Sequence, residues 1–139
     1  MQRILLVEDN PGDAQLVRMA FAEALPSARV SVVTDGEAAL VRLRDEGPPD
    51  LLLLDLNLPR LSGHEVLEEI RTDAALRRLP VVVLSSSEAE ADVTRSYELG
   101  ANSHVAKPGD VDALFALAET LARYWFGAVT LPGGTAPRR

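Results

Sequence analysis

Residues 51–59 have the sequence LLLLDLNLP, which is the most informative segment of the chain for its fold class. Its leucines form an apolar run of strand length that does not alternate with polar residues. Such a run is typical of a strand that is buried on both faces of a parallel sheet. We therefore expect Asp55, the residue that directly follows the run, at the carboxyl end of a rigid central strand.

Similar apolar runs recur on both sides of this stretch, and we expect them to be buried strands as well. They are Ile4–Val7, Val30–Val33, Val81–Leu84 and a weaker one at His104–Ala106. The segments between them show helical spacing, and Asp35 and Ser62 are suited to cap two of these helices. Strand followed by helix, repeated along the chain, predicts a doubly wound α/β domain with helices on both faces of a parallel sheet.

Two of the expected helices depart from the simple pattern. The segment 88–99 is mostly polar, and a thin inner face predicts weak anchoring and mobility; its expected members are Ala89, Val93, Ser96 and Tyr97. The segment 111–125 has a broad core stripe of Val111, Leu114, Phe115, Ala118, Leu121, Ala122 and Trp125. It has a second stripe of Ala113, Leu117, Thr120 and Tyr124. A helix with two apolar faces usually has two partners, although a slightly apolar surface helix is the alternative. Residues 127–139 are expected to form a tail or arm after a domain at 1–126.

Composition excludes several classes of protein. With 139 residues the chain is expected to form one domain, and with no cysteine it has no disulfide, thiol nucleophile or cysteine metal site. No apolar run reaches the length of a membrane span, and Glu8 and Asp9 interrupt the first run where a signal peptide would continue. The net charge of −7 disfavours contact with nucleic acid, whose phosphates would be repelled. We expect a cytoplasmic protein without membrane or nucleic-acid contact.

Polar side chains follow the ends of the expected strands. They are Glu8 and Asp9, then Asp55 and Asn57, then Ser85 to Ser87, and last Lys107, the only lysine among 14 basic residues. In an open parallel sheet these strand ends meet at one edge, where ligands bind. The glycine-rich nucleotide-binding motifs are absent. Acidic oxygen ligands in small number suit Mg²⁺.

Each of these residues also has a structural alternative. Asp13 is best explained as a helix start, where carboxylates are favoured by the helix dipole. That explanation is poor for Glu8 and Asp9 together, because adjacent acids beside a third need a cation to offset their repulsion. Asp55 in this place suits a metal ligand or a nucleophile that forms an aspartyl phosphate. Ser85 could alternatively cap the following helix, and Lys107 could pair with any acid.

These residues carry a resemblance to a known family. The motifs are Val7-Glu8-Asp9, Leu54–Pro59 with Ser62-Gly63, Val83–Ser86, Gly100-Ala101 and Ala106–Pro108. In this order and spacing the chain, over about residues 2–125, resembles the receiver domain of two-component response regulators. The resemblance implies a flavodoxin-like (βα)5 fold, a parallel five-stranded sheet in the order 2-1-3-4-5, and phosphorylation by a histidine kinase. Its acidic first turn further resembles small stand-alone regulators that serve bacterial phytochrome kinases.

The resemblance also implies a role for each matching residue. Asp55 would be the phosphoacceptor, and Mg²⁺ would be bound by Asp9, Asp55 and the Asn57 carbonyl, with Glu8 joining through water. Ser85 would be the switch hydroxyl, and Lys107 would contact the phosphoryl group. The Lys107–Pro108 bond would be cis. The chain departs from the family at Glu8, which often is Asp, and at His104, which commonly is Tyr or Phe at the switch position.

The resemblance leaves three readings of function. In the first, phosphorylation switches a binding module that acts through protein–protein contacts or a phosphorelay, since only a short segment follows the domain. A homodimer would form through the face made by the fourth helix, the fifth strand and the fifth helix. The second reading is a Mg²⁺-dependent phosphatase with an Asp nucleophile, which would want an acid where Asn57 stands. The third is a phosphate-independent scaffold that has lost switching, as the Glu8 and His104 departures would allow.

Overall fold

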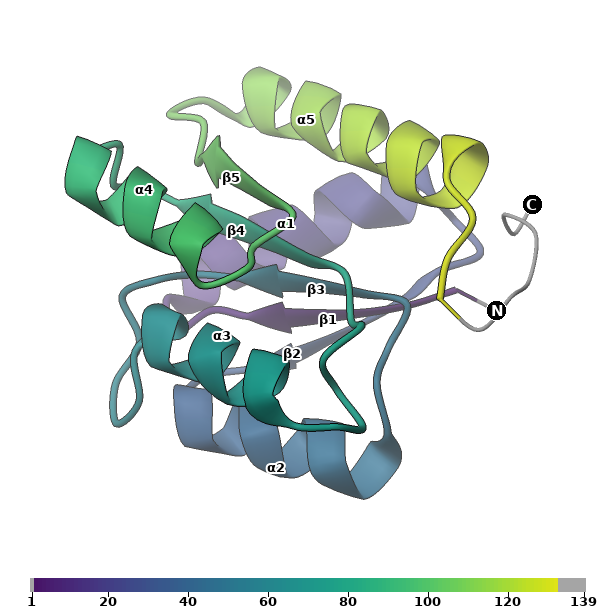
Figure 1. Ribbon diagram of the computed structural model, residues 1–139. Coiled ribbons are helices and arrows are strands. Elements are labelled where there is room, and N and C mark those ends of the chain that lie inside the picture. The colour runs from purple at the N-terminus through teal and green to yellow at the C-terminus, as the bar shows by residue number, and fades with distance from the viewer. Residues whose placement is uncertain (1, 133–139) are drawn as a thin grey trace.

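Strand and helix alternate through residues 2–132, the part of the chain that the computed structural model describes (Figure 1). The strands are β1 (Arg3–Val7), β2 (Arg29–Val33), β3 (Leu51–Leu54), β4 (Val81–Ser85) and β5 (Ser103–Ala106). The helices are α1 (Pro11–Ala24), α2 (Gly36–Glu46), α3 (Gly63–Thr72), α4 (Glu90–Glu98) and α5 (Val111–Arg123), with a π-helical turn at Tyr124–Ala128. All strands pair in parallel in the order β2-β1-β3-β4-β5, so the expected flavodoxin-like topology is confirmed.

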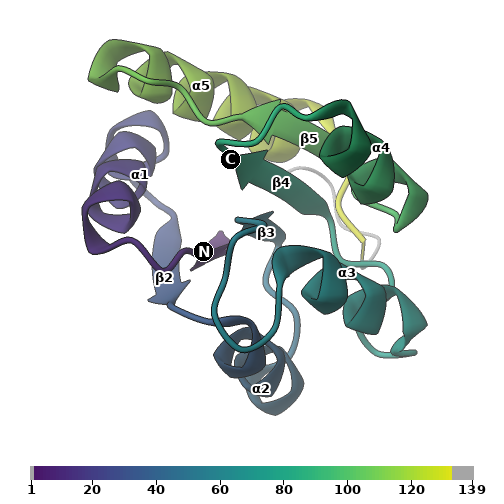
Figure 2. The ribbon, with the colours of Figure 1, turned by 90° about the vertical axis from the view of Figure 1, so that its left-hand side faces the viewer.

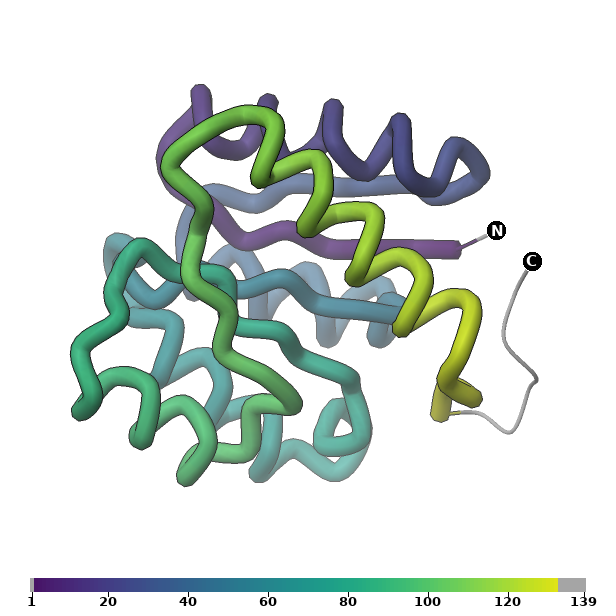
Figure 3. The backbone as a smooth tube through the Cα atoms, turned by 90° about the horizontal axis from the view of Figure 1, so that it is seen from above, coloured from purple at the N-terminus to yellow at the C-terminus, as the bar shows by residue number. Residues whose placement is uncertain are grey.

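Helices cover both faces of this sheet. Viewed along the strands, α1 and α5 lie on one face and α2, α3 and α4 lie on the other (Figure 2). Seen from above, α5 runs across the sheet beside α1, with which it packs (Figure 3). No helix in residues 2–132 is long and apolar enough to cross a membrane.

The central strand β3 supplies side chains to both layers of the core. Leu51 and Leu53 pack with α1 and α5, whereas Leu52 and Leu54 pack with α2 and α3. All four leucines are 0% exposed. The prediction of a strand buried on both faces is therefore confirmed here, and Asp55 directly follows the end of this buried strand.

The edge strand β2 differs from its prediction. Arg29 is exposed and Val30, Ser31 and Val32 are only partly buried. The strand lies at the edge of the sheet and pairs with β1 alone. The apolar run correctly predicted a strand. The run does not indicate, however, whether that strand lies at the centre or at the edge of the sheet, and this position limits how far the strand is buried.

Glycine allows a close approach on either side of the loop that follows Asp55. A Cβ atom on Gly63 would lie 2.2 Å from the Asp55 carbonyl oxygen, and one on Gly36 would lie 2.1 Å from the Leu61 carbonyl oxygen. Ser62 caps α3 in a reciprocal capping box with Glu65, as the sequence predicted for its N-terminus. The start of α3 is therefore pressed against the backbone of Asp55.

Arg71 of α3 joins two loops at the opposite edge of the sheet. Its guanidinium group donates hydrogen bonds to the carbonyl oxygens of Gly100 (2.9 Å), Arg77 (3.1 Å) and Leu79 (2.8 Å), and to Asn102 Oδ1 (3.2 Å). Burial lowers the pKa of Arg71, and these acceptors stabilise its charge. The loops before β4 and β5 are thus fixed to α3.

Four expected details at the last two helices and the loop between β5 and α5 are wrong. Ala89, the N-cap residue of α4, and Tyr97 within α4 are exposed, and Ser96 is the only buried residue of this helix. In α5, Val111 is 49% exposed although it was expected in the core stripe, because it stands at the first turn, beyond the edge of the sheet. No peptide bond among residues 2–132 is cis, so Lys107–Pro108 has the trans form that X–Pro bonds adopt by default.

The expected tail begins within the described part of the chain. Leu131, which follows the π-helical turn, is 4% exposed and packs with the α1 and α5 side of the core. Residues 133–139 of the expected tail lie outside the described residues. The division at 126 and 127 remains a prediction.

Candidate functional site

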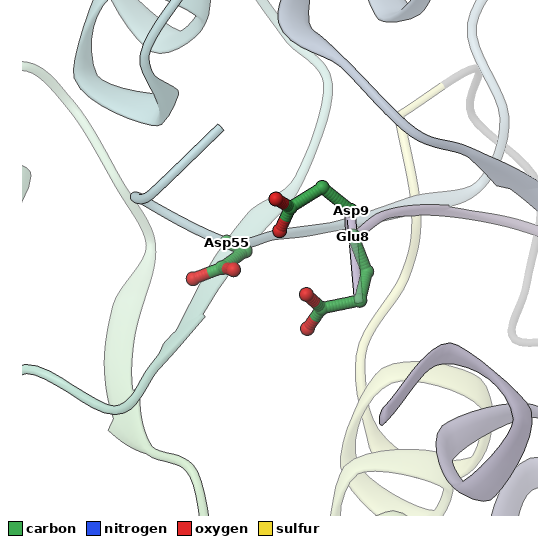
Figure 4. Close-up of side chains that lie close together, drawn as sticks. All are labelled: Glu8, Asp9 and Asp55. Atoms are coloured by element: carbon green, nitrogen blue, oxygen red, sulfur yellow. The ribbon is translucent and has the colours of Figure 1, made fainter. Parts of the chain in front are cut away.

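Three carboxylates converge at the carboxyl ends of β1 and β3 (Figure 4). Val7 and Leu54 are partners in the register of the two strands, so Glu8 and Asp55 leave the sheet side by side, with Asp9 next to them. One oxygen from each carboxylate lies within 4.8 Å of the others. Glu8 is 2% and Asp55 is 6% exposed, whereas Asp9 is open to solvent.

Lys107 lies at the same place and is the cation that faces these acids. Its Nζ atom is 2.5 Å from Glu8 Oε1, 3.3 Å from Asp13 Oδ2 and 3.9 Å from Asp55 Oδ2. The Lys107 backbone N–H donates to the Ser85 carbonyl (2.8 Å), which fixes the end of β5 beside β4. The Lys107 side chain is 14% exposed, so solvent screens its contacts with the buried Glu8 and Asp55 little, whereas the Asp13 side chain is 43% exposed.

The charges of the site do not balance. Burial raises the pKa of Glu8 and the charge of Asp55 raises it further, although hydrogen bonds from Lys107 and the Asn10 N–H oppose this. Burial would lower the pKa of Lys107, but its hydrogen bond to Glu8 and the charges of Asp55 and Asp13 outweigh burial and raise it. Lys107 therefore stays charged at neutral pH, and one cation faces an excess of carboxylates.

This excess suits a divalent cation. Carboxylate and carbonyl oxygens are the ligands that Mg²⁺ takes, and it keeps several waters when few protein ligands are offered. Asp9 presents its carboxylate to solvent, while Glu8 and Asp55 present theirs from the interior. The exposed residue Asn57 lies beside them, with its N–H 3.5 Å from Asp55 Oδ1. The residues present therefore fit such an ion.

Ser85 ends β4, the strand next to β3, and is 0% exposed. Its Oγ accepts a hydrogen bond from the Ser87 N–H (3.1 Å), which leaves the hydroxyl proton available for another acceptor. The Ser87 hydroxyl in turn donates to Asp92 Oδ2 (2.5 Å) of α4. The loop after Ser85 is thereby tied to the start of α4.

His104 makes its contacts on the α4 side rather than with the carboxylates. Its Nδ1 atom is 2.9 Å from Ser96 Oγ, and its Nε2 atom is 3.1 Å from the Ser87 carbonyl oxygen. The expected residues thus fall into two groups. Glu8, Asp9, Asp55 and Lys107 meet directly, whereas Ser85 and His104 meet through the loop between β4 and α4.

Sequence reasoning missed the part that Asp13 plays in the site. The Asn10 side chain caps α1, and Asp13 in the first turn reaches Lys107. No spacing in the sequence signalled this contact, because Asp9 precedes the N-cap of α1 and helical periodicity therefore does not relate it to Asp13.

The comparisons with known proteins agree with this geometry. Residues 4–119 match the model of the response regulator receiver domain. The chain belongs to this family, as its motifs and the order of its strands predicted.

Three relatives illustrate the similarity. The response regulator Rcp1 of Synechocystis sp. is 40% identical in an alignment of 135 positions that covers 93% of this chain and 92% of Rcp1. The probable methanogenesis regulatory protein FilR2 of Methanothrix harundinacea is 41% identical, over 94% of this chain and 87% of the relative. The phosphorylated cyanobacterial phytochrome response regulator RcpA superposes with a TM-score of 0.89 at 42% identity, covering 95% of this chain and 99% of RcpA. Rcp1 in its Mn²⁺-bound form superposes with a TM-score of 0.85 at 39% identity, covering 96% and 100%.

Proposed function

We propose that this chain is a single-domain response regulator that accepts a phosphoryl group on Asp55 from a histidine kinase. It acts in the cytoplasm and passes the signal on through protein–protein contacts or a phosphorelay. The observation that carries the proposal is the position of Asp55. Its buried carboxylate follows the end of the central strand, beside two further acids and 3.9 Å from the Lys107 ammonium group.

Each residue of the site has a separate role in the proposed phosphoryl transfer. An Asp55 oxygen attacks phosphorus and forms the acyl-phosphate bond, while the phosphorus–nitrogen bond of the phosphohistidine breaks and imidazole leaves. Lys107 and the Ser85 hydroxyl supply a cation and a proton donor for the phosphoryl oxygens, since such transfer depends mainly on positioning and charge. Glu8, Asp9, Asp55 and the Asn57 carbonyl would hold Mg²⁺, which neutralises phosphoryl charge when bound.

The kinase that we propose as partner is of the phytochrome type. The support is similarity to RcpA, which is named as a phytochrome response regulator, and to the bacteriophytochrome response regulator RtBRR, 39% identical. Both alignments cover nearly all of this chain, 95% and 99%. The similarity therefore extends beyond the residues that every phosphoacceptor site needs.

We further propose a homodimer through the face formed by α4, β5 and α5. Large side chains stand exposed on or beside this face, namely Tyr97 at 50%, Val111 at 49% and Tyr124 at 54%. Leu117 in the middle of α5 is only partly buried by the chain itself. A second copy would remove this surface from water, which favours association.

The experiment that tests the phosphoacceptor is intact-protein mass spectrometry after incubation with a small-molecule phosphodonor and Mg²⁺. We expect one phosphoryl group on the wild-type chain and on Asp112→Asn, a control variant at an exposed position in the first turn of α5. Asp55→Asn should gain none, and a chelator should prevent the gain in every variant. Unchanged phosphorylation of Asp55→Asn would refute the assignment. Absence of phosphorylation throughout, even with purified kinase, would favour a phosphate-independent scaffold.

A further inference from the structure

The Lys107 ammonium group donates hydrogen bonds to two carboxylates, and only one of them belongs to the three-carboxylate group at the strand ends. The acceptors are Glu8 Oε1 (2.5 Å) and Asp13 Oδ2 (3.3 Å), whereas Asp55 Oδ2, at 3.9 Å, lies beyond hydrogen-bond distance. Glu8 is a member of the three-carboxylate group, and Asp13 is not. Asp13 therefore binds the lysine without being part of the site that suits a divalent cation.

The start of α1 fixes Asp13 beside the lysine. Asn10 caps this helix, and its Oδ1 atom accepts a hydrogen bond from the Asp13 N–H (2.9 Å). A carboxylate in the first turn is also stabilised by the helix dipole. Asp13 consequently needs no lysine to stay in place, and its partly exposed side chain can form hydrogen bonds with water when the lysine leaves.

The lysine has room to move away from Asp13. Both residues line a hollow of about 110 Å³ between the start of α1 and the segment that leads from β5 into α5. Because side chains do not fill this hollow, Lys107 and Asp13 can separate without displacing the core.

A phosphoryl group on Asp55 changes which contact of the lysine is most favourable. It brings about two negative charges to a side chain that is 8% exposed, where solvent screens them little. Of the two hydrogen bonds of the lysine, the one to Asp13 is the more exposed, because the Glu8 side chain is buried. An exposed pair contributes little, since water replaces the partner. The contact with Asp13 is therefore the one that breaks when Lys107 turns to the phosphoryl group.

We propose that Asp13 is a positioning residue that keeps Lys107 on the α1 side of the site until Asp55 carries a phosphoryl group. Phosphorylation then moves the ammonium group from Asp13 to the phosphoryl oxygens, and the surface at the start of α1 gains an unpaired carboxylate. This release rests on the proposed function, because it needs the phosphoryl group on Asp55. The hold on Lys107 in the unphosphorylated protein does not.

The reactivity of the lysine amine tests the hold directly, because Lys107 is the only lysine of the chain. Its acetylation by an N-hydroxysuccinimide ester is measured by peptide mass spectrometry. We expect acetylation to be about 2- to 5-fold faster in Asp13→Asn than in wild type, the effect of one partly exposed ion pair.

Asp110→Asn is the matched control for this measurement. It removes a carboxylate from the same hollow, and asparagine keeps the cap that Asp110 provides for α5 through the Ala113 N–H (2.8 Å). Among residues 2–132, the carboxylates that pair with Lys107 are those of Glu8, Asp13 and Asp55. Asp110→Asn should therefore be acetylated at the wild-type rate.

Beryllofluoride, a stable mimic of a phosphoryl group on aspartate, tests the release. With Mg²⁺ and beryllofluoride, wild type and Asp13→Asn should be acetylated at equal rates, because wild-type Lys107 has then left Asp13. A ¹⁹F signal of the bound group that is absent in Asp55→Asn shows that the mimic occupies the site. Phosphorylation by a small-molecule donor should also be about 2- to 5-fold faster in Asp13→Asn, since no contact with Asp13 has to be broken.

The outcomes separate this proposal from the proposed function. Equal acetylation of free wild type and Asp13→Asn would refute the hold, and so would an equal gain in Asp110→Asn, which would assign the effect to charge alone. A rate difference that persists with bound beryllofluoride, or an unchanged phosphorylation rate, would refute the release. Absence of bound beryllofluoride from every variant would refute the Asp55 assignment, while the rates in the free protein still decide the hold.

Discussion

Replacement of Lys107 by methionine removes the cation from the acidic site and keeps a side chain of similar length. The Glu8 side chain is 3% exposed and the Lys107 side chain 14%, so the pair is almost wholly buried. Removing one partner of a buried pair costs about 3–5 kcal/mol, because the remaining charge loses its compensation. The residual exposure of Lys107 places our expectation near the lower end, at about 3 kcal/mol of unfolding free energy at pH 7.

The loss should depend on pH in a definite direction. The pKa of Glu8 already lies above its ordinary value of 4.5 in the folded protein, and without Lys107 it rises further. A carboxyl group with a raised folded pKa costs nothing below the unfolded pKa, and it destabilises the fold as the pH rises through the folded pKa. The variant should therefore approach wild-type stability at pH 4.5 and fall progressively behind toward pH 7.

Urea unfolding followed by circular dichroism measures this loss. With a slope of about 2 kcal/mol per molar urea, 3 kcal/mol lowers the midpoint by about 1.5 M at pH 7. Arg123→Met is the matched control, because it breaks the 2.6 Å pair with Glu119 at a side chain that is 79% exposed. An exposed pair of this kind contributes under about 0.5 kcal/mol despite its short distance.

A second variant separates the loss of charge compensation from the loss of the lysine stem. Glu8→Gln combined with Lys107→Met leaves no buried charge uncompensated within the pair and should recover most of the lost stability. The reasoning is refuted if Lys107→Met matches wild type at pH 7, or if its deficit is the same at pH 4.5 and pH 7.

Other substitutions test how the site is supported and what it contacts. Gly63→Ala should cost about 3 kcal/mol or more in urea unfolding, because its Cβ would lie 2.2 Å from the Asp55 carbonyl oxygen, whereas Gly109→Ala meets nothing within 4 Å; equal stability of the two variants would contradict this. Arg71→Lys should lower the free energy of unfolding by about 2 kcal/mol in the same assay, since an ammonium group cannot donate to all the acceptors of the planar guanidinium group. A urea midpoint equal to that of wild type would show that these hydrogen bonds do not contribute to stability. Leu117→Glu should lower the mass of a wild-type dimer to that of a monomer in light scattering, and identical monomer masses would refute the proposed dimer.

The sequence predicted the centre of the fold better than its margins. The run Leu51–Leu54, which has no polar residue, predicted a strand buried on both faces. This prediction placed Asp55 correctly at the end of the central strand. The run Val30–Val33, which includes Ser31, lies at an edge and is partly exposed, because burial there depends on a neighbouring strand that the sheet does not supply. Periodicity failed in α4, where too few apolar residues were present to define a face, and Tyr97 is 50% exposed.

The candidate site was predictable where it depends on strand ends. Glu8, Asp9, Asp55 and Lys107 were expected together because parallel strands end at one edge, and they meet there. The contact of Asp13 with Lys107 depends on the pitch of α1 and on a long side chain. The contacts of Ser96 in α4 with both His64 and His104 depend on how α3, α4 and β5 pack. Neither packing distance is encoded locally, so residue patterns alone did not reveal them.

Because α4 has a single buried residue, little free energy is needed to displace this helix from the rest of the protein. A helix with several buried leucines would need about 1.5–3 kcal/mol for each side chain exposed on moving. Only Ser96 is buried in α4, and on exposure its hydroxyl group can form hydrogen bonds with water in place of those with the two histidines. One phosphoryl group has only a few charge-assisted hydrogen bonds to offer. Under the proposed function, the sparse face of α4 would keep the free energy of displacing this helix within what one phosphoryl group supplies, whereas a better-packed helix would resist displacement.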